Sequence, residues 1–187
     1  MDRLAAATGP DGMNRPGVSR DAVLDHNARA WDRLAEGSAA LARPAADEAF
    51  GDPRAWLGSG GAAGRPWLPE RLDGLRVLCL AAGGGKHGPL YAAAGAKVTV
   101  LDISPAMLEL DRQVSRERKV DLEILQGSMD DLSTLAARPF DLVIHPVSTC
   151  YVPDVARVFR EVARVTRPVA SAQMRTLMLS VAERVFL

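Results

Sequence analysis

The segment from Leu75 to Asp102 constrains the fold more than any other part of the chain. Residues 76–82 (RVLCLAA) form a short, continuous apolar run, which is typical of a strand buried on both faces. Three glycines, Gly83, Gly85 and Gly88, follow at the spacing G-x-G-x-x-G, and a helix is predicted over 86–94, with Gly95 placed to end it. A second apolar run over 97–101 ends at Asp102. This order predicts a parallel strand–helix–strand unit.

The same alternation continues beyond Asp102. Ser104 and Pro105 are a typical helix start, and the predicted helix runs to about residue 119. Strands are predicted over 121–125 and 140–145, and a helix over 153–166. The fold class is therefore α/β: a Rossmann-like, open parallel sheet with helices on both faces and an N-terminal helical cap.

Four regions follow from these patterns. Residues 1–18, rich in glycine and proline, are expected to be a disordered lead-in. Residues 19–74 form a cap of helix and loop, with a helix that begins at Ser19. Residues 75–168 are the Rossmann-like core. Residues 169–187 carry apolar residues at helical spacing and are expected to form a C-terminal helix.

The amino-acid composition limits the kinds of binding partner that the chain is expected to have. Lysine and arginine total 23, as do aspartate and glutamate, whereas nucleic-acid-binding proteins usually carry a basic excess, so no nucleic-acid partner is expected. No apolar run approaches the roughly 20 residues that a membrane span needs, so no membrane partner is expected either. Cys79 and Cys150 suit neither a disulfide framework nor a zinc site, which favours reduced thiols in a cytoplasmic protein with no metal.

The glycine turn predicts a nucleoside cofactor. Glycines let a ligand approach the backbone closely, and the following helix adds N–H groups and positive potential. A carboxylate at Asp102, at the end of the second strand, can accept hydrogen bonds from both ribose hydroxyls. A nicotinamide dinucleotide and S-adenosyl-L-methionine both fit this geometry, and the turn alone does not separate them.

The segments VLCLAAGGGKHGPLYAAAGAKVTVLDIS, LQGSMDDLS and FDLVIHPVSTCYVPDVARVFREVARVTRP resemble the class I S-adenosylmethionine-dependent methyltransferases of the small-molecule type. The resemblance extends over about residues 26–168. It implies S-adenosyl-L-methionine as cofactor, an unidentified small molecule as methyl acceptor, and the turn at 145–148 near the methionine end. It assigns cofactor contacts to Ala81, Gly83, Gly84, Gly85, Asp102, Ile103, Ser128, Met129, His145 and Pro146.

The resemblance also assigns a lid. The segment HNARAWD resembles the N-terminal helix that covers the cofactor in related enzymes, with Asn27 and Trp31 facing the site and Tyr151 near the substrate. His145 is the best-placed general base, although a histidine at a strand's end is more often a packed structural residue. Lys86 and His87, at the start of the helix, offer basic groups to the cofactor carboxylate.

The sequence departs from the family pattern at three positions. Many relatives have an acidic residue where Cys79 stands, a glycine where Ala81 stands, and an aspartate where Ser128 stands. The aspartate binds the adenine amino group, and a serine hydroxyl can accept the same bond. The AAGGGKHG sequence resembles a recognisable subgroup.

The predicted sheet is incomplete. It has about four strands of the family's usual seven, because the stretch after Pro168 does not read as a fifth strand. The expected consequence is a C-terminally truncated domain in which the edge of strand four is exposed and open to self-association. Two alternatives to an active methyltransferase remain: a truncated, catalytically inactive relative or interaction module, and a nicotinamide-dependent oxidoreductase.

Overall fold

A computed structural model describes residues 19–58, 68–135, 139–146 and 148–167. Four parallel strands form its centre: β1 (Arg76–Leu80), β2 (Lys97–Asp102), β3 (Leu122–Gln126) and β4 (Leu142–Ile144). Their order in the sheet is β3-β2-β1-β4. Val77 of β1 is in register with Val98 of β2 and Leu142 of β4. The predicted α/β class and the four-strand core are confirmed.

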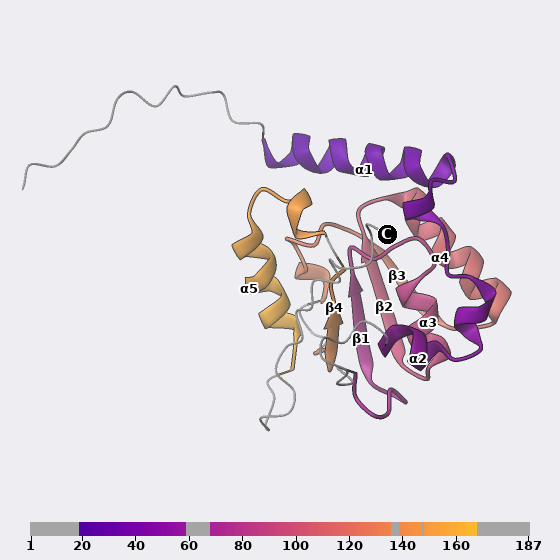
Figure 1. The fold of residues 1–187 in the computed structure, drawn as a ribbon. Coiled ribbons are helices and arrows are strands. Elements are labelled where there is room, and N and C mark those ends of the chain that lie inside the picture. Colours follow the sequence, from indigo (N-terminus) through magenta and orange to yellow (C-terminus); the bar gives the residue numbers. More distant parts are fainter. Residues whose placement is uncertain (1–18, 59–67, 136–138, 147, 168–187) are drawn as a thin grey trace, which may run out of the picture.

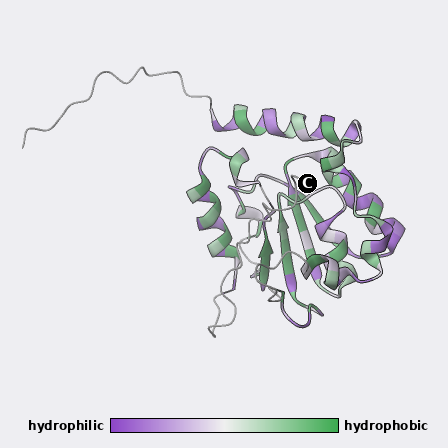
Figure 2. Ribbon diagram, in the orientation of Figure 1, coloured by the Kyte–Doolittle hydropathy of each residue, from purple (hydrophilic) through white to green (hydrophobic). Residues whose placement is uncertain are grey.

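The strands bury both faces, as their continuous apolar sequence predicts. On one face, Val77 and Cys79 pack with residues of α2 (Pro53–Gly58), α3 (His87–Ala93) and α4 (Pro105–Arg118). On the other face, Leu78 and Leu80 pack with residues of α5 (Val155–Val165). Figure 2 shows the apolar strands between helices of mixed hydropathy. Two apolar layers therefore hold the sheet between its helices.

Side-chain caps define the helix starts. Ser19 accepts a hydrogen bond from the Ala22 N–H at the start of α1 (Arg20–Glu36), and Ser104 accepts one from the Met107 N–H at the start of α4. Asp154 plays the same role for α5. Gly95, with φ of +95°, ends the turn after α3, as expected of a glycine there. The predicted boundaries hold to within about two residues, the usual scatter at helix ends.

The predicted cap consists of α1, the short 3₁₀ helices at Ala40–Ala42 and Asp47–Phe50, and α2. Figure 1 shows α1 lying across the carboxyl ends of the strands. None of its residues is fully buried, so α1 packs on the rest of the chain through partly buried side chains. The lead-in over 1–18 and the predicted helix over 169–187 lie outside the described residues.

Beside β4, the segment after α5 pairs with Phe140 and Asp141. Phe140 forms a parallel bridge with Thr166: the Phe140 N–H donates to Val165 O, and the Arg167 N–H donates to Phe140 O. The chain after α5 thus returns to the side of β4 at its amino end. Self-association through this edge stays a prediction.

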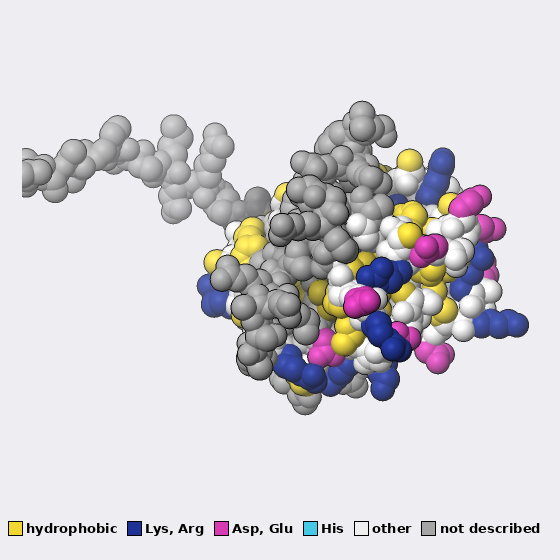
Figure 3. All heavy atoms as spheres, turned by 60° about the horizontal axis from the view of Figure 1, so that its bottom comes forward, with side chains coloured by type: hydrophobic (Ala, Val, Ile, Leu, Met, Phe, Trp, Pro, Cys, Tyr) yellow, Lys and Arg dark blue, Asp and Glu magenta, His cyan; other side chains and the backbone are white. Residues whose placement is uncertain are grey.

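The surface is mixed in charge. On the face seen in Figure 3, basic and acidic side chains lie among one another over the right-hand part of the view. Among the helices of the described residues, none is long and apolar enough to cross a membrane.

Candidate cofactor site

The glycine turn between β1 and α3 requires glycine for two different reasons. Gly84 and Gly85 have φ of +105° and +70°, in the left-handed region that side chains disfavour. Gly83 has no such backbone, but a Cβ there would lie 2.9 Å from Met107 Cβ and 3.0 Å from Asp102 Oδ2. The first position of the turn is therefore fixed by close packing against β2 and α4.

Two carboxylates hold the turn from behind. The Gly83 N–H donates to Asp102 Oδ2 at 2.9 Å, and the Gly84 N–H donates to Asp111 Oδ2 at 2.9 Å. Asp102 was predicted at the site, but Asp111 was not. The turn's conformation therefore depends on residues of β2 and α4 as well as on its own glycines.

Ala81 follows β1 and adopts a left-handed backbone with φ of +49°. Its N–H donates to Leu101 O at 2.7 Å. For a residue with a Cβ this conformation costs about 1–2 kcal/mol. A glycine, which the resemblance predicts here, would adopt this backbone without that cost, so Ala81 places strain at the turn.

A cavity of about 400 Å³ opens at the carboxyl ends of the strands, beneath α1. Its wall combines the glycine turn, the end of β2, and the segments after β3 and β4. Most of the predicted site residues line it: Asn27, Trp31, Ala81, Gly83, Asp102, Ile103, Ser128, Met129, Pro146 and Tyr151. Gly84, Gly85 and His145 do not contribute to the wall.

Asp102 lines this wall with 7% of its surface exposed. Its Oδ1 accepts the Ser104 N–H at 2.9 Å, and its Oδ2 accepts the Gly83 N–H. Burial raises the pKa of Asp102, while these backbone N–H groups act in the opposite direction. Each carboxylate oxygen can accept more than one hydrogen bond, so both retain capacity for a ligand.

A polar chain fixes the segment after β3. The Ser128 hydroxyl donates to Asp130 Oδ1 at 2.5 Å, and Arg20 of α1 pairs with both oxygens of Asp130 at 2.7 Å. The Arg20 guanidinium lowers the pKa of the Asp130 carboxyl below its usual value. Because the Ser128 hydrogen is used in this bond, the oxygen has only acceptor capacity left for the cavity.

The lid residues meet across the cavity mouth. Asn27 Nδ2 of α1 donates to Tyr151 O at 2.6 Å, and the Trp31 and Tyr151 rings meet edge to face with centroids 5.6 Å apart. These contacts bring α1 together with the 3₁₀ turn at Thr149–Tyr151, more than 100 positions away in the sequence. Asn27, Trp31 and Tyr151 all line the cavity, and their role as a lid stays a prediction.

The basic residues beside the glycine turn are partly buried. Lys86 Nζ donates to Leu41 O at 3.0 Å, and burial lowers its pKa. Burial, with the neighbouring Lys86 charge, lowers the pKa of His87 to about 4, so its imidazole is neutral at neutral pH. Both side chains line the cavity, and Lys86 is the one that brings positive charge to the turn.

His145 lies behind Met129. Its Nε2 is 3.2 Å from Met129 Sδ, and Met129 lines the cavity whereas His145 does not. Burial lowers the pKa of His145, so the ring is neutral at neutral pH. The predicted base has the required protonation state but stands one side chain away from the wall.

Sequence reasoning missed several wall residues: Leu24, Leu41, Ala82, Met107, Gly127 and Val152. It also missed Asp111. Met107, Leu108, Asp111 and Val114 are the buried residues of α4, so Asp111 lies at helical spacing on an apolar face. A carboxylate at a position expected to be buried was the signal available for it. Among the described residues, no cluster suited to a metal ion occurs.

Comparison with known families places the fold and the cavity in context. Residues 78–172 match the family described as a methyltransferase domain. The chain belongs to this family. The nicotinamide-dependent and inactive alternatives receive no support from the comparisons.

Individual relatives agree with the methyltransferase family. The chain is 37% identical over 152 residues to an uncharacterized methyltransferase, YbaJ, of Bacillus subtilis, covering 79% of this chain and 59% of that protein. It is 31% identical over 113 residues to a ubiquinone biosynthesis O-methyltransferase of Xanthomonas oryzae, covering 59% of this chain and 47% of the relative. The chain thus spans about half to three fifths of the length of these methyltransferases.

A solved structure supports the same assignment. An S-adenosylmethionine-dependent methyltransferase from Mesorhizobium loti superposes with a TM-score of 0.51 and 30% identity, covering 64% of this chain and 51% of that one. A phosphoethanolamine N-methyltransferase of Haemonchus contortus shares the fold. It superposes with a TM-score of 0.60 at 19% identity, covering 80% of this chain and 31% of that one.

Proposed function

We propose that this methyltransferase domain binds S-adenosyl-L-methionine in the cavity beneath α1 and transfers its methyl group to a small-molecule acceptor. One observation carries the proposal: a single cavity of about 400 Å³ is lined by the glycine turn, Asp102, and the segments after β3 and β4. Its donors and acceptors suit a nucleoside joined to an amino acid. When bound, the cofactor supplies a methyl group activated by a sulfonium.

The adenosine would lie on the β2 and β3 side of the cavity. The free acceptor capacity of Asp102 suits the two ribose hydroxyls. Ile103 and Met129 offer apolar surface to the adenine ring. Ser128, whose hydrogen is held by Asp130, would accept a bond from the adenine amino group in place of the family's aspartate.

The methionine part would lie over Ala81 and Gly83, which line this end of the cavity. Lys86 would pair with the cofactor carboxylate, since it is the cationic side chain at this end of the wall. Pro146 would close the methionine end from the β4 side.

The acceptor would enter between α1 and the Thr149–Tyr151 turn. Trp31 and Tyr151 present aromatic surface at this mouth, and Leu24 and Val152 add apolar surface. Transfer from a sulfonium is an in-line displacement, so the protein contributes mainly by positioning the acceptor and excluding water. Where the acceptor carries a proton, His145 would take it once Met129 moves aside, because Met129 and not His145 lines the cavity.

Equilibrium binding tests the proposal. Isothermal titration with S-adenosylmethionine, S-adenosylhomocysteine and NAD should show binding of the first two and none of NAD. Tight NAD binding without S-adenosylhomocysteine binding would overturn it. Methyl transfer is tested separately with tritiated cofactor and a panel of aromatic and apolar small molecules. Binding without transfer to any acceptor would favour the inactive alternative.

A further inference from the structure

Asp111 is a buried carboxylate with no assigned role in binding or catalysis. It lies on the inner face of α4 with 0% of its surface exposed. Its Oδ2 accepts the Gly84 N–H, whereas its Oδ1 is buried without a hydrogen-bond partner among the described residues. A half-satisfied buried carboxylate is costly, so its presence calls for a physical reason.

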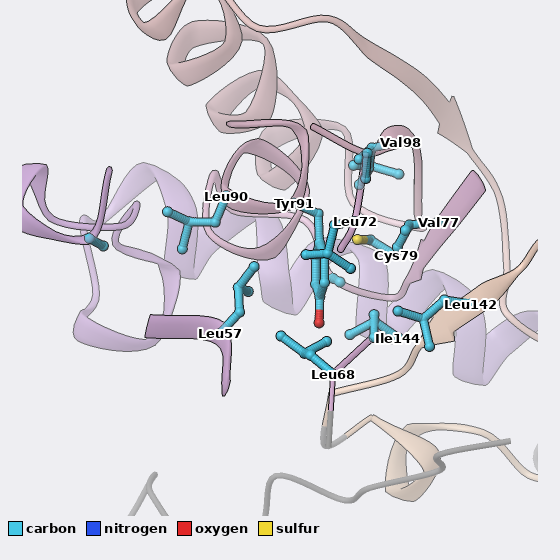
Figure 4. Packing of buried hydrophobic residues seen from close by; sticks show 14 of the residues in the cluster. Leu57, Leu68, Leu72, Val77, Cys79, Leu90, Tyr91, Val98, Leu142 and Ile144 are labelled. Atoms are coloured by element: carbon cyan, nitrogen blue, oxygen red, sulfur yellow. The ribbon is translucent and has the colours of Figure 1, made fainter. Parts of the chain in front are cut away.

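The surroundings of Asp111 do not neutralise it. Cys79 of β1 is uncharged because burial raises its pKa well above the usual value, and Tyr91 of α3 is uncharged for the same reason. Figure 4 shows Tyr91 pointing between Leu68 and Ile144, in the same apolar layer as Cys79.

The charged groups that act on Asp111 oppose each other. Asp102 of β2 adds negative charge, and Arg112, exposed on the same helix, adds positive charge. Burial dominates and raises the pKa of Asp111 to about 7, against the opposing effect of the Gly84 and Gly85 N–H groups. The charge of this carboxylate therefore changes near neutral pH.

The two carboxylates together engage the whole turn. Asp102 accepts the Gly83 N–H, and Asp111 accepts the Gly84 N–H. The Gly85 N–H also lowers the pKa of Asp111. In phosphate-binding glycine turns these N–H groups point outward to the anion. Here the Gly83 N–H points inward to Asp102, and the Gly84 N–H points inward to Asp111 and to Met107 O, at 3.0 Å from the latter. A phosphate placed on the turn would therefore find neither of these two donors and would lie close to two carboxylates.

We propose that Asp111 is a positioning residue that holds the cofactor turn with its N–H groups facing inward, and that it thereby selects a phosphate-free nucleoside ligand over a nucleotide. The selection of a nucleoside ligand rests on the proposed cofactor function, whereas the anchoring of the turn does not. The residue acts through Gly84 and Gly85 and does not contact the ligand itself.

The anchoring is tested in the unliganded protein. With ¹⁵N-glycine labelling, the Gly84 and Gly85 amide resonances should move together with a midpoint near pH 7 in the wild type, and this step should vanish in Asp111→Asn. The Gly83 amide, which donates to Asp102, is the internal comparison. Its resonance should not show the shift near pH 7 that Asp111→Asn abolishes at Gly84 and Gly85. Absence of the step in the wild type, or its persistence in Asp111→Asn, would overturn the proposal.

The selection is tested by competition. Adenosine should displace S-adenosylhomocysteine at least about tenfold more effectively than ADP does, and Asp111→Asn should narrow this ratio. Asp111→Leu, which keeps the size but removes the acceptor, should weaken S-adenosylhomocysteine binding by about tenfold or more, and Asp111→Asn should restore it. Tyr91→Phe, a buried polar change that leaves the turn untouched, should bind like the wild type.

The outcomes separate the two proposals. A wild type that does not bind S-adenosylhomocysteine contradicts the proposed function, and the glycine resonances alone then decide the anchoring. A wild type that binds, with a folded Asp111→Leu of equal affinity or with ADP as effective as adenosine, contradicts the role of Asp111. If Asp111→Leu does not fold, the pH dependence of the Gly84 and Gly85 amide resonances in the wild type and in Asp111→Asn still tests the role of Asp111.

Discussion

The Asp32 carboxylate of α1 accepts a 2.6 Å hydrogen bond from the hydroxyl of Ser104, the residue that caps α4. The same Asp32 oxygen accepts the Ala106 N–H at 3.1 Å. The cap helix is therefore tied to the corner between β2 and α4, directly beside Asp102. Since α1 has no fully buried residue, polar contacts of this kind hold it over the cavity.

Removing the Asp32 contact should loosen the lid. Asp32→Ala leaves the Ser104 hydroxyl and the Ala106 N–H without their partner, which typically costs about 1–3 kcal/mol. We expect faster hydrogen exchange in α1 and a cofactor dissociation rate raised about tenfold. Asp25→Ala, an exposed change on the same helix, is the matched control. Equal exchange in both variants would show that α1 is held by other contacts.

Asp102 should determine cofactor affinity. Asp102→Ala removes the proposed ribose contact and should weaken S-adenosylhomocysteine binding by about 1–3 kcal/mol. Because burial raises the pKa of Asp102, wild-type binding should weaken as pH falls through that raised value and the carboxylate is protonated. Titration calorimetry across pH measures both effects. Unchanged affinity in Asp102→Ala would remove this residue from the site.

Asp111 should make stability depend on pH. Its pKa is raised to about 7 in the folded state, so the folded chain binds a proton that the unfolded chain releases near pH 4. Stability from this group is therefore full at low pH and is lost as pH rises to about 7. Between pH 5 and 8 the wild type should lose about 2–3 kcal/mol relative to Asp111→Asn. Urea unfolding at pH 5 and pH 8 measures the free energy of unfolding of both proteins. The same difference between wild type and Asp111→Asn at the two pH values would contradict this prediction.

The proposed general-base role of His145 can be tested by kinetics. Its lowered pKa leaves the ring neutral, so His145→Gln should lower kcat by about 10²–10⁴-fold with little change in KM for the cofactor. A raised cofactor KM with unchanged kcat would instead assign to His145 the support of Met129, whose Sδ its ring contacts. Steady-state kinetics with an acceptor found in the transfer screen separate the two.

Local pattern predicts most of this fold. The apolar run over 76–82 and the glycines after it indicate a buried strand and a tight turn, because both features depend on neighbours in the sequence. The contact of Asp32 with Ser104 joins residues 72 positions apart, and that of Asp111 with Gly84 joins residues 27 apart. Such contacts depend on how helices pack, which periodicity does not specify.

Most of the residues that line the cavity could also be predicted from the sequence. Family resemblance identified most of the cavity wall through segments that follow strands, since the carboxyl ends of parallel strands meet at one edge. From the cap it identified Asn27 and Trp31 but not Leu24 and Leu41, whose position depends on the packing of α1 and the loop after it. The fourth strand was predicted over 140–145, whereas β4 covers only Leu142–Ile144.

Ala81 offers a test of strain at the cofactor turn. Ala81→Gly should raise the free energy of unfolding by about 1 kcal/mol, because glycine accepts the left-handed backbone that alanine adopts there at a cost. Ala82→Gly is the matched control: Ala82 is buried and lacks a positive φ, so losing its methyl group should destabilise the chain. Urea unfolding of both variants measures the difference. A destabilised Ala81→Gly would mean that the Ala81 methyl contributes more by its packing against the layer beside α5 than its backbone costs.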